Sequence, residues 1–298
     1  MTHHARAQEF LGELAENPPR LPFEPAFLAG LFAGTGEDSM ISADQLAEMV
    51  SRSQNLAAQV LRLANSAYYG FGSAVSSLSK AIRILGLAEV RNLVIGLGAA
   101  AAFKQSALPK GFPVGKTWTH QVLTAVTARE LARAAKESVP AMRDVVPDEL
   151  YTAGLLHDLG KVLVAAKRPE DWLAMVNLAV EKDLPFHLAE EAYWGIDHSV
   201  VGARLLVFWE IPTRLTELVG WHHAPALADE EFRPNACLLE AANIIANSVS
   251  GSGRLEEELP ADARELLPAE LTNEILVPRL TALLSDEKSA SLAAALVA

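Results

Sequence analysis

A histidine and an aspartate, His157 and Asp158, stand side by side in a stretch from Leu150 to Lys161 that is otherwise almost wholly apolar. Burying a carboxylate costs on the order of several kcal/mol unless a partner compensates its charge. The pair therefore needs a specific partner, and a bound metal ion is one candidate. On a helix, Lys161 would share one broad face with both residues, because it follows them by four and three positions.

Further candidate ligands are histidines on predicted helices or at their edges: His120, His198, His222 and His223. His222 extends the apolar stripe of its predicted helix, so its side chain should point inward. His223 is rotated by about 100° from it and reaches the same site only if the helix opens there. His198 shares a helical face with Gly202, which would let another element come close. Mixtures of imidazole and carboxylate suit iron, manganese, zinc and nickel.

A single buried histidine is more often a hydrogen-bonded core residue than a metal ligand. We interpret His3, His4 and His187 in this way, as surface or structural residues. Because the other histidines cluster with Asp158, a metal site becomes a serious alternative for them. Their spacing alone leaves both interpretations open.

Composition limits the class of protein. The chain has 298 residues, 50% of them hydrophobic and 21% charged, so it can bury a sizeable core. Its net charge of −12 argues against nucleic acid as a partner. Cys237 is the only cysteine, which excludes an internal disulfide and suits a reducing compartment. The apolar run from Leu93 to Phe103 is too short to cross a bilayer, and the start lacks a signal peptide, so we expect a cytoplasmic protein without membrane association.

Helical spacing of alanine, leucine and glutamate recurs along the chain, so the predicted fold class is all-α. Ser42 and Gln45 fit a capping box at the start of one helix. A short helix is predicted to begin at residue 27, a loop is predicted at 65–72, and further helices are predicted at 55–64, 78–85, 88–103, 117–136, 148–166, 169–182, 199–209, 213–223 and 237–248. Prolines and glycines alternate in 109–115. This break predicts an N-terminal helical subdomain (1–110), a second helical subdomain (111–250) and an acidic helical tail (251–298), which Gly251 to Gly253 separate from the second subdomain.

Two sets of motifs resemble a known family. The sequence Leu-Leu-His-Asp-Leu-Gly-Lys around His157, together with the other histidines, resembles the HD superfamily of metal-dependent phosphohydrolases. Residues 60–70 (VLRLANSAYYG) and 77–86 (SLSKAIRILG) are similar to the signature of the HDOD family, the HD-related output domain of bacterial signalling proteins. The resemblance covers about residues 20–250. It implies an N-terminal helical subdomain packed on an HD-like helical subdomain, and a regulatory role.

The resemblance also implies ligands. It assigns His120, His157 and Asp158 to one ion, with Asp158 as a bridge, and His198, His222 and His223 to a second ion. Iron is the favoured metal, with manganese, nickel and zinc as alternatives. Lys161 falls where related phosphodiesterases place a lysine near the substrate phosphate.

Three departures limit this transfer. Asn243 stands where HD enzymes have an aspartate, and its neutral amide would be a weaker ligand. No Gly-Tyr-Pro segment follows His223, and Lys116 stands where HD-GYP enzymes place a glutamate. These departures argue against a cyclic-di-GMP phosphodiesterase.

Three functions follow as hypotheses. The first is an HDOD regulatory protein that retains a metal site and acts through a signalling partner or a small phosphorylated ligand. The second is a metal-dependent phosphohydrolase in which Asp158 and Lys161 are catalytic. The third, nucleic-acid binding through the basic region between Arg52 and Asn92, is disfavoured because a charge run is more often a solvated face. A homodimer is left open.

Overall fold

The computed structural model describes residues 3–23, 25–35, 41–65, 75–103, 108–250 and 259–268, together with residues 278 and 282. Within these residues every regular element is a helix, so the predicted all-α class is confirmed. Residues 66–72 of the predicted loop, the predicted separation at Gly251 to Gly253 and most of the predicted tail lie outside the described residues.

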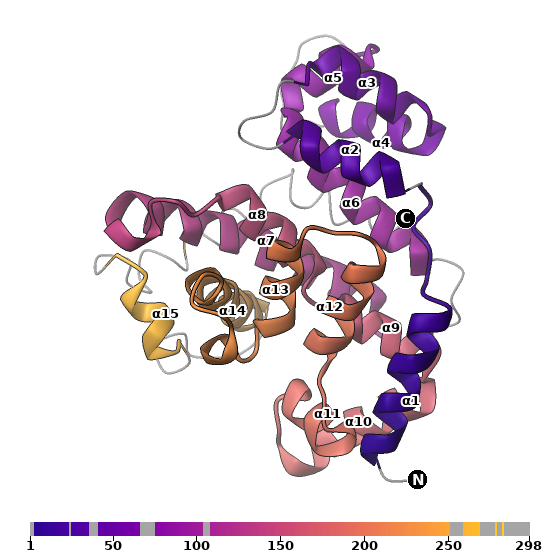
Figure 1. The fold of residues 1–298 in the computed structure, drawn as a ribbon, viewed down its shortest axis with the longest axis vertical. Coiled ribbons are helices and arrows are strands. Elements are labelled where there is room, and N and C mark those ends of the chain that lie inside the picture. Colours follow the sequence, from indigo (N-terminus) through magenta and orange to yellow (C-terminus); the bar gives the residue numbers. More distant parts are fainter. Residues whose placement is uncertain are drawn as a thin grey trace.

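The first group of helices forms the upper part of Figure 1. It comprises α2 (Pro25–Thr35), α3 (Ala43–Ser51), α4 (Gln54–Ala64), α5 (Leu78–Leu85) and α6 (Leu87–Phe103). The predicted capping box is confirmed, because the Ser42 hydroxyl accepts from the backbone N–H of Gln45 while the Gln45 side chain accepts from the backbone N–H of Ser42. α5 and α6 meet at Gly86, where φ is 88°, a conformation that suits glycine.

The second group surrounds the candidate site. It comprises α7 (Val114–Ser138), α8 (Pro147–Leu156), α9 (Leu159–Lys167), α10 (Pro169–Lys182), α11 (Phe186–Trp194), α12 (His198–Phe208), α13 (Thr213–Trp221) and α14 (Arg233–Ser250), with α15 (Ala261–Glu265) against α14. Short 3-10 turns lie at Pro140–Met142 and Pro225–Leu227. α7 packs along α8 and α14, while α12 packs on α9 and α13.

The two groups share one core. α6 is buried on nearly all sides because it extends from the first group to contact α8 and α9 of the second (Figure 1). Buried apolar side chains of both groups belong to one continuous cluster. The N-terminal helices are therefore packed on the second group, as expected for this fold, while the division at 110 and 250 stays a prediction. Among the described residues no single helix is long and apolar enough to cross a membrane, and α5 with α6 would qualify only as a pair bent by 104°.

Three helical features differ from the prediction. No helix is predicted at 3–16 or 186–194, where the structure has α1 (His3–Glu16) and α11. α1 lies beside α11 and α12 (Figure 1), and Arg6 ties it there by donating to Asp171 (3.1 Å) and to the Tyr193 hydroxyl (3.0 Å). The single helix predicted at 148–166 is wrong, because α8 ends at Leu156 and α9 begins at Leu159.

Two glycines allow the helices around this break to approach backbone to backbone. A Cβ on Gly154 would lie 2.5 Å from the Cα of Ala125, so α8 crosses α7 without a side chain between them. A Cβ on Gly160 would overlap the carbonyl oxygen of His198 and lie 2.9 Å from the backbone nitrogen of Gly202. The close approach expected at Gly202 is thus confirmed, and the two crossings bring α7, the α8–α9 break and α12 to one place.

Candidate metal centre

The break between α8 and α9 has a local cause in the side chain of His157. The Nδ1 of His157 lies 2.8 Å from the carbonyl oxygen of Gly154, three residues earlier. In a continuing helix that carbonyl would accept from the backbone N–H of Asp158. The imidazole therefore caps its own helix, and Asp158 leaves the helical path at φ −98° and ψ 8°.

The same arrangement recurs at the end of α13. The Nδ1 of His222 lies 2.7 Å from the carbonyl oxygen of Val219, again three residues earlier, and α13 ends at Trp221. His223 is thereby released toward the site, as the sequence required for it to reach the same cavity as His222. Each self-capping histidine thus sends the next residue, Asp158 or His223, into the cluster.

These caps fix which nitrogen of each ring carries the proton. A carbonyl oxygen only accepts, so Nδ1 of His157 and Nδ1 of His222 must donate. In each neutral ring Nε2 therefore carries no proton and has a free lone pair. Both Nε2 atoms are buried without a hydrogen-bond partner among the described residues. The two rings meet edge to face with centroids 5.0 Å apart. Two bare nitrogen acceptors therefore converge in the interior.

The first group of candidate ligands joins His157 and Asp158 to His120 on α7. The Nε2 of His157 lies 3.3 Å from Oδ1 of Asp158, and the Nε2 of His120 lies 3.7 Å from Oδ2. One donor atom from each residue fits within a span of 4.8 Å. Asn243 on α14 is close to this group, because its Oδ1 lies 2.9 Å from the Nε2 of His120. The neutral amide thus contacts His120 at the position where an aspartate is expected.

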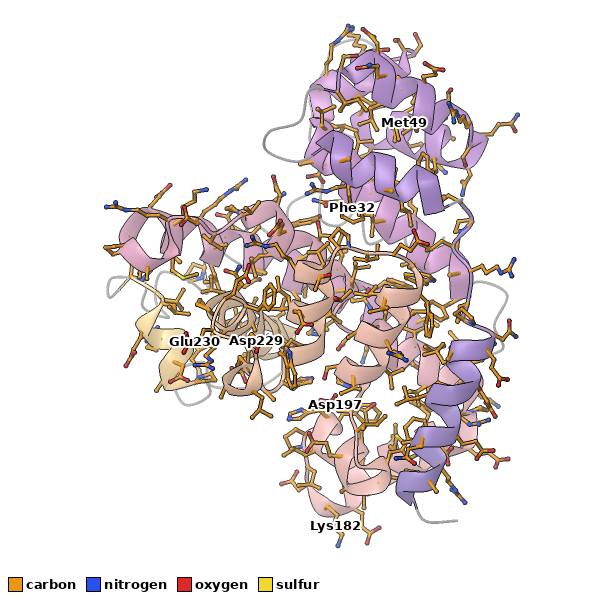
Figure 2. All side chains as sticks on the ribbon, viewed as in Figure 1. Phe32, Met49, Lys182, Asp197, Asp229 and Glu230 are labelled. Carbon is orange, nitrogen blue, oxygen red and sulfur yellow. The ribbon has the colours of Figure 1, made fainter. Side chains whose placement is uncertain are left out.

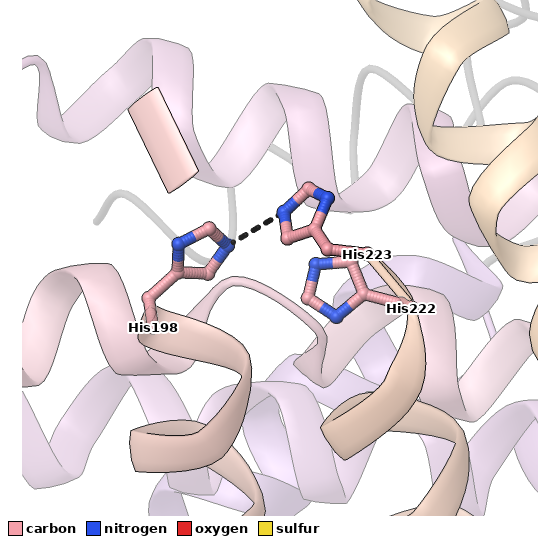
Figure 3. A group of neighbouring side chains, drawn as sticks. All are labelled: His198, His222 and His223. Atoms are coloured by element: carbon pink, nitrogen blue, oxygen red, sulfur yellow. Dashed lines mark hydrogen bonds between the residues drawn. The ribbon is translucent and has the colours of Figure 1, made fainter. Parts of the chain in front are cut away.

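The second group joins His198 on α12 to His222 and His223, and its donor atoms also fit within 4.8 Å. Figure 3 shows the Nε2 atoms of His198 and His223 facing one another, 3.1 Å apart. The Nε2 of His198 also lies 3.1 Å from Oδ1 of Asp158. Asp158 therefore stands between the two groups, and all seven predicted site residues lie together with Lys161, whose Nζ is 2.8 Å from Oδ2 of Asp158.

Two residues of α11 complete the surroundings, and neither is predicted as part of the site. The carboxylate of Glu190 accepts from the backbone N–H of His198 at 3.1 Å and also contacts its Nδ1. His187, interpreted above as surface or structural, stacks on His223 with ring centroids 4.0 Å apart and planes 12° from parallel. Asp197, labelled in Figure 2, lies in the turn after α11 and caps α12 by accepting from the N–H groups of Ser199 and Val200. α11 and this cap set the place of His198.

Burial keeps four of the clustered histidines neutral. Burial lowers the pKa of His120 and of His157 below the usual range, and it lowers the pKa of His222 to about 3, with His198 adding to the shift. The pKa of His223 is lowered by burial and by the neighbouring His222 and His198. These four rings are neutral near pH 7 and keep a lone pair, which is the state that binds metal.

The acidic residues and His198 behave differently. Burial disfavours the charge on His198, but the carboxylates of Glu190 and Asp158 outweigh it and raise its pKa to about 9. Burial also opposes ionisation of Asp158, whereas its partners His157, Lys161 and His198 hold the pKa of that carboxyl well below its usual range. Because His157 is neutral near pH 7, the balancing cations at that pH are Lys161 and His198. Burial raises the pKa of Glu190.

The donor set fits a transition-metal ion. Imidazole nitrogens with a carboxylate are ligands that iron, manganese, nickel and zinc accept. The Nε2 atoms of His157 and His222 are buried without a hydrogen bond among the described residues, so a bound cation would supply the partner they lack. The chain therefore has residues able to hold metal.

Comparison with known proteins gives the following matches. Residues 12–225 match the family model of the HDOD domain. An uncharacterised protein of Treponema pallidum (strain Nichols) is 24% identical over 221 residues, which are 74% of this chain but only 41% of that protein. The chain thus spans less than half the length of this relative.

Solved structures share the fold over almost the whole chain. A protein of Shewanella amazonensis SB2B, named provisionally as a phosphohydrolase, is 25% identical with a TM-score of 0.72, covering 96% of this chain and 97% of its own. An HDOD domain protein of unknown function from Geobacter sulfurreducens is 23% identical with a TM-score of 0.74, covering 94% and 95%. A protein of Marinobacter aquaeolei VT8, named provisionally for signal transduction, is 22% identical with a TM-score of 0.75, covering 99% and 67%. At these identities the last two show the fold alone.

Proposed function

Because the chain belongs to the HDOD domain family, we propose that it is a regulatory protein that holds metal at the His–Asp cluster and acts through a signalling partner or a small phosphorylated ligand. One observation supports metal binding most directly: the buried Nε2 atoms of His157 and His222 lack any hydrogen-bond partner among the described residues. Each unsatisfied buried acceptor costs about 1–3 kcal/mol. A bound cation removes that cost at both nitrogens.

The proposed arrangement has two ions. His120, His157 and Asp158 hold one, with Asn243 as a weak additional ligand. The second is held by His198, His222 and His223, with Asp158 as the bridge between the two. Iron is the favoured metal, and manganese, nickel and zinc are the alternatives for this donor set.

The charge of the cluster supports a phosphorylated ligand. Asp158 is the one carboxylate among the proposed ligands, since Asn243 is neutral, while two divalent ions would carry four positive charges. Positive charge left uncompensated in a buried site is costly. An anionic group from a ligand would compensate it, and the side chains of Lys161 and His120 are 24% and 13% exposed, so the cluster is not wholly sealed on their side.

A metal-dependent phosphohydrolase is the second candidate, and the place of Lys161 favours it. Its ammonium group contacts Asp158 at 2.8 Å and is partly exposed, so it could also neutralise a phosphate beside the cluster. A divalent ion there would supply Lewis-acid activation of water and of the phosphate ester. Asp158 would orient the site and Lys161 would bind phosphate. Asn243 weighs against this candidate, because it removes one negative charge from the site.

Metal content tests the proposal directly. The protein would be purified without added metal and analysed by mass spectrometry for bound elements, beside His157→Ala, His222→Ala and the control Asn177→Ala, whose side chain is exposed on α10. We expect two ions per chain in the parent and in the control, and one ion in each histidine variant. A parent protein that binds no metal, even when metal is supplied, would refute the proposal.

Turnover separates the two candidates. The metal-loaded protein would be incubated with phosphate monoesters, nucleotides and cyclic dinucleotides, and released phosphate or cleaved product would be measured. The regulatory proposal expects no turnover but a rise in melting temperature with at least one phosphorylated compound. Metal-dependent turnover that His157→Ala and Lys161→Ala both abolish would replace it with the phosphohydrolase.

A further inference from the structure

We infer that Glu190 is a positioning residue for metal binding, which holds the ring of His198 as a ligand and selectively supports the second group, His198, His222 and His223. This inference rests on the metal binding proposed above. It adds a residue outside the set of ligands and assigns it to one of the two ions.

The position of Glu190 is built by α11. The helix follows Pro185 and ends before Gly195, where φ is 81°, so the chain turns sharply and enters α12 at His198. Glu190 lies on the buried face of α11 and is only 2% exposed. Glu190 lies eight positions before His198, yet its Oε2 contacts both the backbone nitrogen (3.1 Å) and Nδ1 of that residue. One carboxylate oxygen therefore holds the main chain and the ring together.

This contact fixes what His198 can offer the cluster. An ionised carboxylate only accepts, so Nδ1 must carry a proton and Nε2 is directed to the metal. Nε2 is indeed the atom that lies 3.1 Å from both Asp158 Oδ1 and His223 Nε2. His157 and His222 have neutral backbone carbonyls in the same role. His198 therefore differs from His157 and His222, because a charged group orients its ring and makes the ring a stronger electron donor.

Asp158 lies beside both groups, but the groups differ in the further polar partner of their histidines. The first group has the neutral Asn243 beside His120. The second has a buried carboxylate, Glu190, directly behind His198. Since a buried cation is stabilised by nearby negative charge, we expect the second ion to depend on Glu190 and the first to be indifferent to it.

A purely structural role for Glu190 predicts something else. If the carboxylate only joins α11 to α12, its loss should lower the stability of the metal-free fold and weaken both ions together. A positioning role predicts a loss confined to the second ion. The experiment must therefore measure the two ions separately.

Glu190→Gln, Glu190→Ala and the control Glu191→Gln, an exposed neighbour on the same helix, would be made in the full chain. Each would also be combined with His120→Ala, which leaves only the second ion, and with His223→Ala, which leaves only the first. Zn²⁺ affinity would be measured against a chelator, and Co²⁺ absorption would report the geometry of each ion. Melting of the metal-free proteins would show which variants fold.

In the His120→Ala background we expect Glu190→Ala to weaken Zn²⁺ binding about 10–100-fold, in line with the loss of such an outer carboxylate. Glu190→Gln should weaken it less, because its amide oxygen can still accept from Nδ1, and Glu191→Gln should have no effect. In the His223→Ala background all three should bind Zn²⁺ like their parent. If Glu190→Ala does not fold, the Zn²⁺ affinity and the Co²⁺ spectrum of Glu190→Gln distinguish the positioning role from the purely structural role.

Two results would overturn the inference while leaving the proposed function intact: unchanged affinity for the second ion in both Glu190 variants, or an equal loss at both ions. If the parent protein binds no metal at all, the inference and the proposed function fall together. The parent titration therefore distinguishes the two failures.

Discussion

Gly160→Ala should be among the most damaging small substitutions in this chain. Gly160 is the second residue of α9 and faces the first turn of α12. An added Cβ would overlap the carbonyl oxygen of His198 and lie 2.8 Å from its carbonyl carbon, whereas ordinary contacts begin at 3.4 Å. These neighbours are backbone atoms, so no side-chain rotation can relieve the overlap. α9 and α12 would have to move apart.

The magnitude follows from two opposing effects. Overpacking of a core costs about 1–3 kcal/mol, and a backbone neighbour places this case at the upper end, about 3 kcal/mol. Alanine favours a helix over glycine by up to ~1 kcal/mol. The net loss in the free energy of unfolding is therefore about 2 kcal/mol or more. The same movement would separate Asp158 from His198, so binding of the second ion should weaken as well.

Urea denaturation followed by tryptophan fluorescence would measure the loss, with Gly12→Ala as the matched control. Gly12 lies exposed on α1, and an added Cβ there meets nothing within 4 Å. The control should gain about 0.5–1 kcal/mol from helix propensity alone. A Gly160→Ala protein as stable as its parent, with unchanged Zn²⁺ affinity, would refute the backbone contact between α9 and α12.

Three further substitutions test other parts of the structure. Thr152→Val removes the hydroxyl that lies 2.7 Å from Oδ1 of the fully buried Asn92 and 2.8 Å from the carbonyl oxygen of Asp148. Arg91 Nε still donates to Asn92 Oδ1 at 3.4 Å, so the free energy of unfolding in urea should fall by about 0.5–1.5 kcal/mol, and no change would mean that this second donor suffices. Arg83→Met removes an ion pair with Asp44 whose side chains are 61% and 65% exposed, so the free energy of unfolding should hardly change, and a clear loss would contradict the exposed setting. Burial and the nearby Asp262 raise the pKa of Glu240 to about 7 from an ordinary 4.5. The folded state therefore binds this proton more tightly than the unfolded state does. The free energy of unfolding should consequently fall as the pH rises from about 4.5 to about 7. Glu240→Gln should therefore melt at a higher temperature than the parent at pH 8 but at the same temperature near pH 4, and a constant difference across this range would rule out the titration.

Three residues of the cluster carry a local signal in the sequence, whereas Asn243 was identified only through the resemblance to HD enzymes. His157 and Asp158 stand out as polar residues within an apolar run, and His222 continues an apolar stripe. The break between α8 and α9 was not predictable in the same way. Neither proline nor glycine occupies positions 157–158. The helix ends because Nδ1 of His157 donates a hydrogen bond to the carbonyl oxygen of Gly154, which would otherwise accept from the next turn of the helix. That bond depends on a side-chain rotamer, which the order of residues does not specify.

Glu190 and His187 show a second limit. Their helix, α11, has an apolar pattern too short to stand out between Pro185 and Gly195. A glutamate on such a segment looks like any solvated surface charge. Its burial arises only because the turn at Gly195 folds α11 back onto the start of α12. The residues that orient metal ligands are brought into place by such tertiary contacts. Sequence patterns can therefore indicate candidate ligands without indicating the residues that orient them.

The orienting contacts also bear on how the cluster would bind metal. Nδ1 of His157, His198 and His222 is already engaged by a carbonyl or a carboxylate within the folded chain. His157 and His222 are therefore already in their metal-binding tautomer, whereas His198, which is cationic near pH 7, must lose its Nε2 proton when it binds metal. Binding then need not order the ligands, which removes a common entropic cost of association. The fold instead bears the cost of two bare nitrogen atoms in its interior, and that cost is what a cation would relieve.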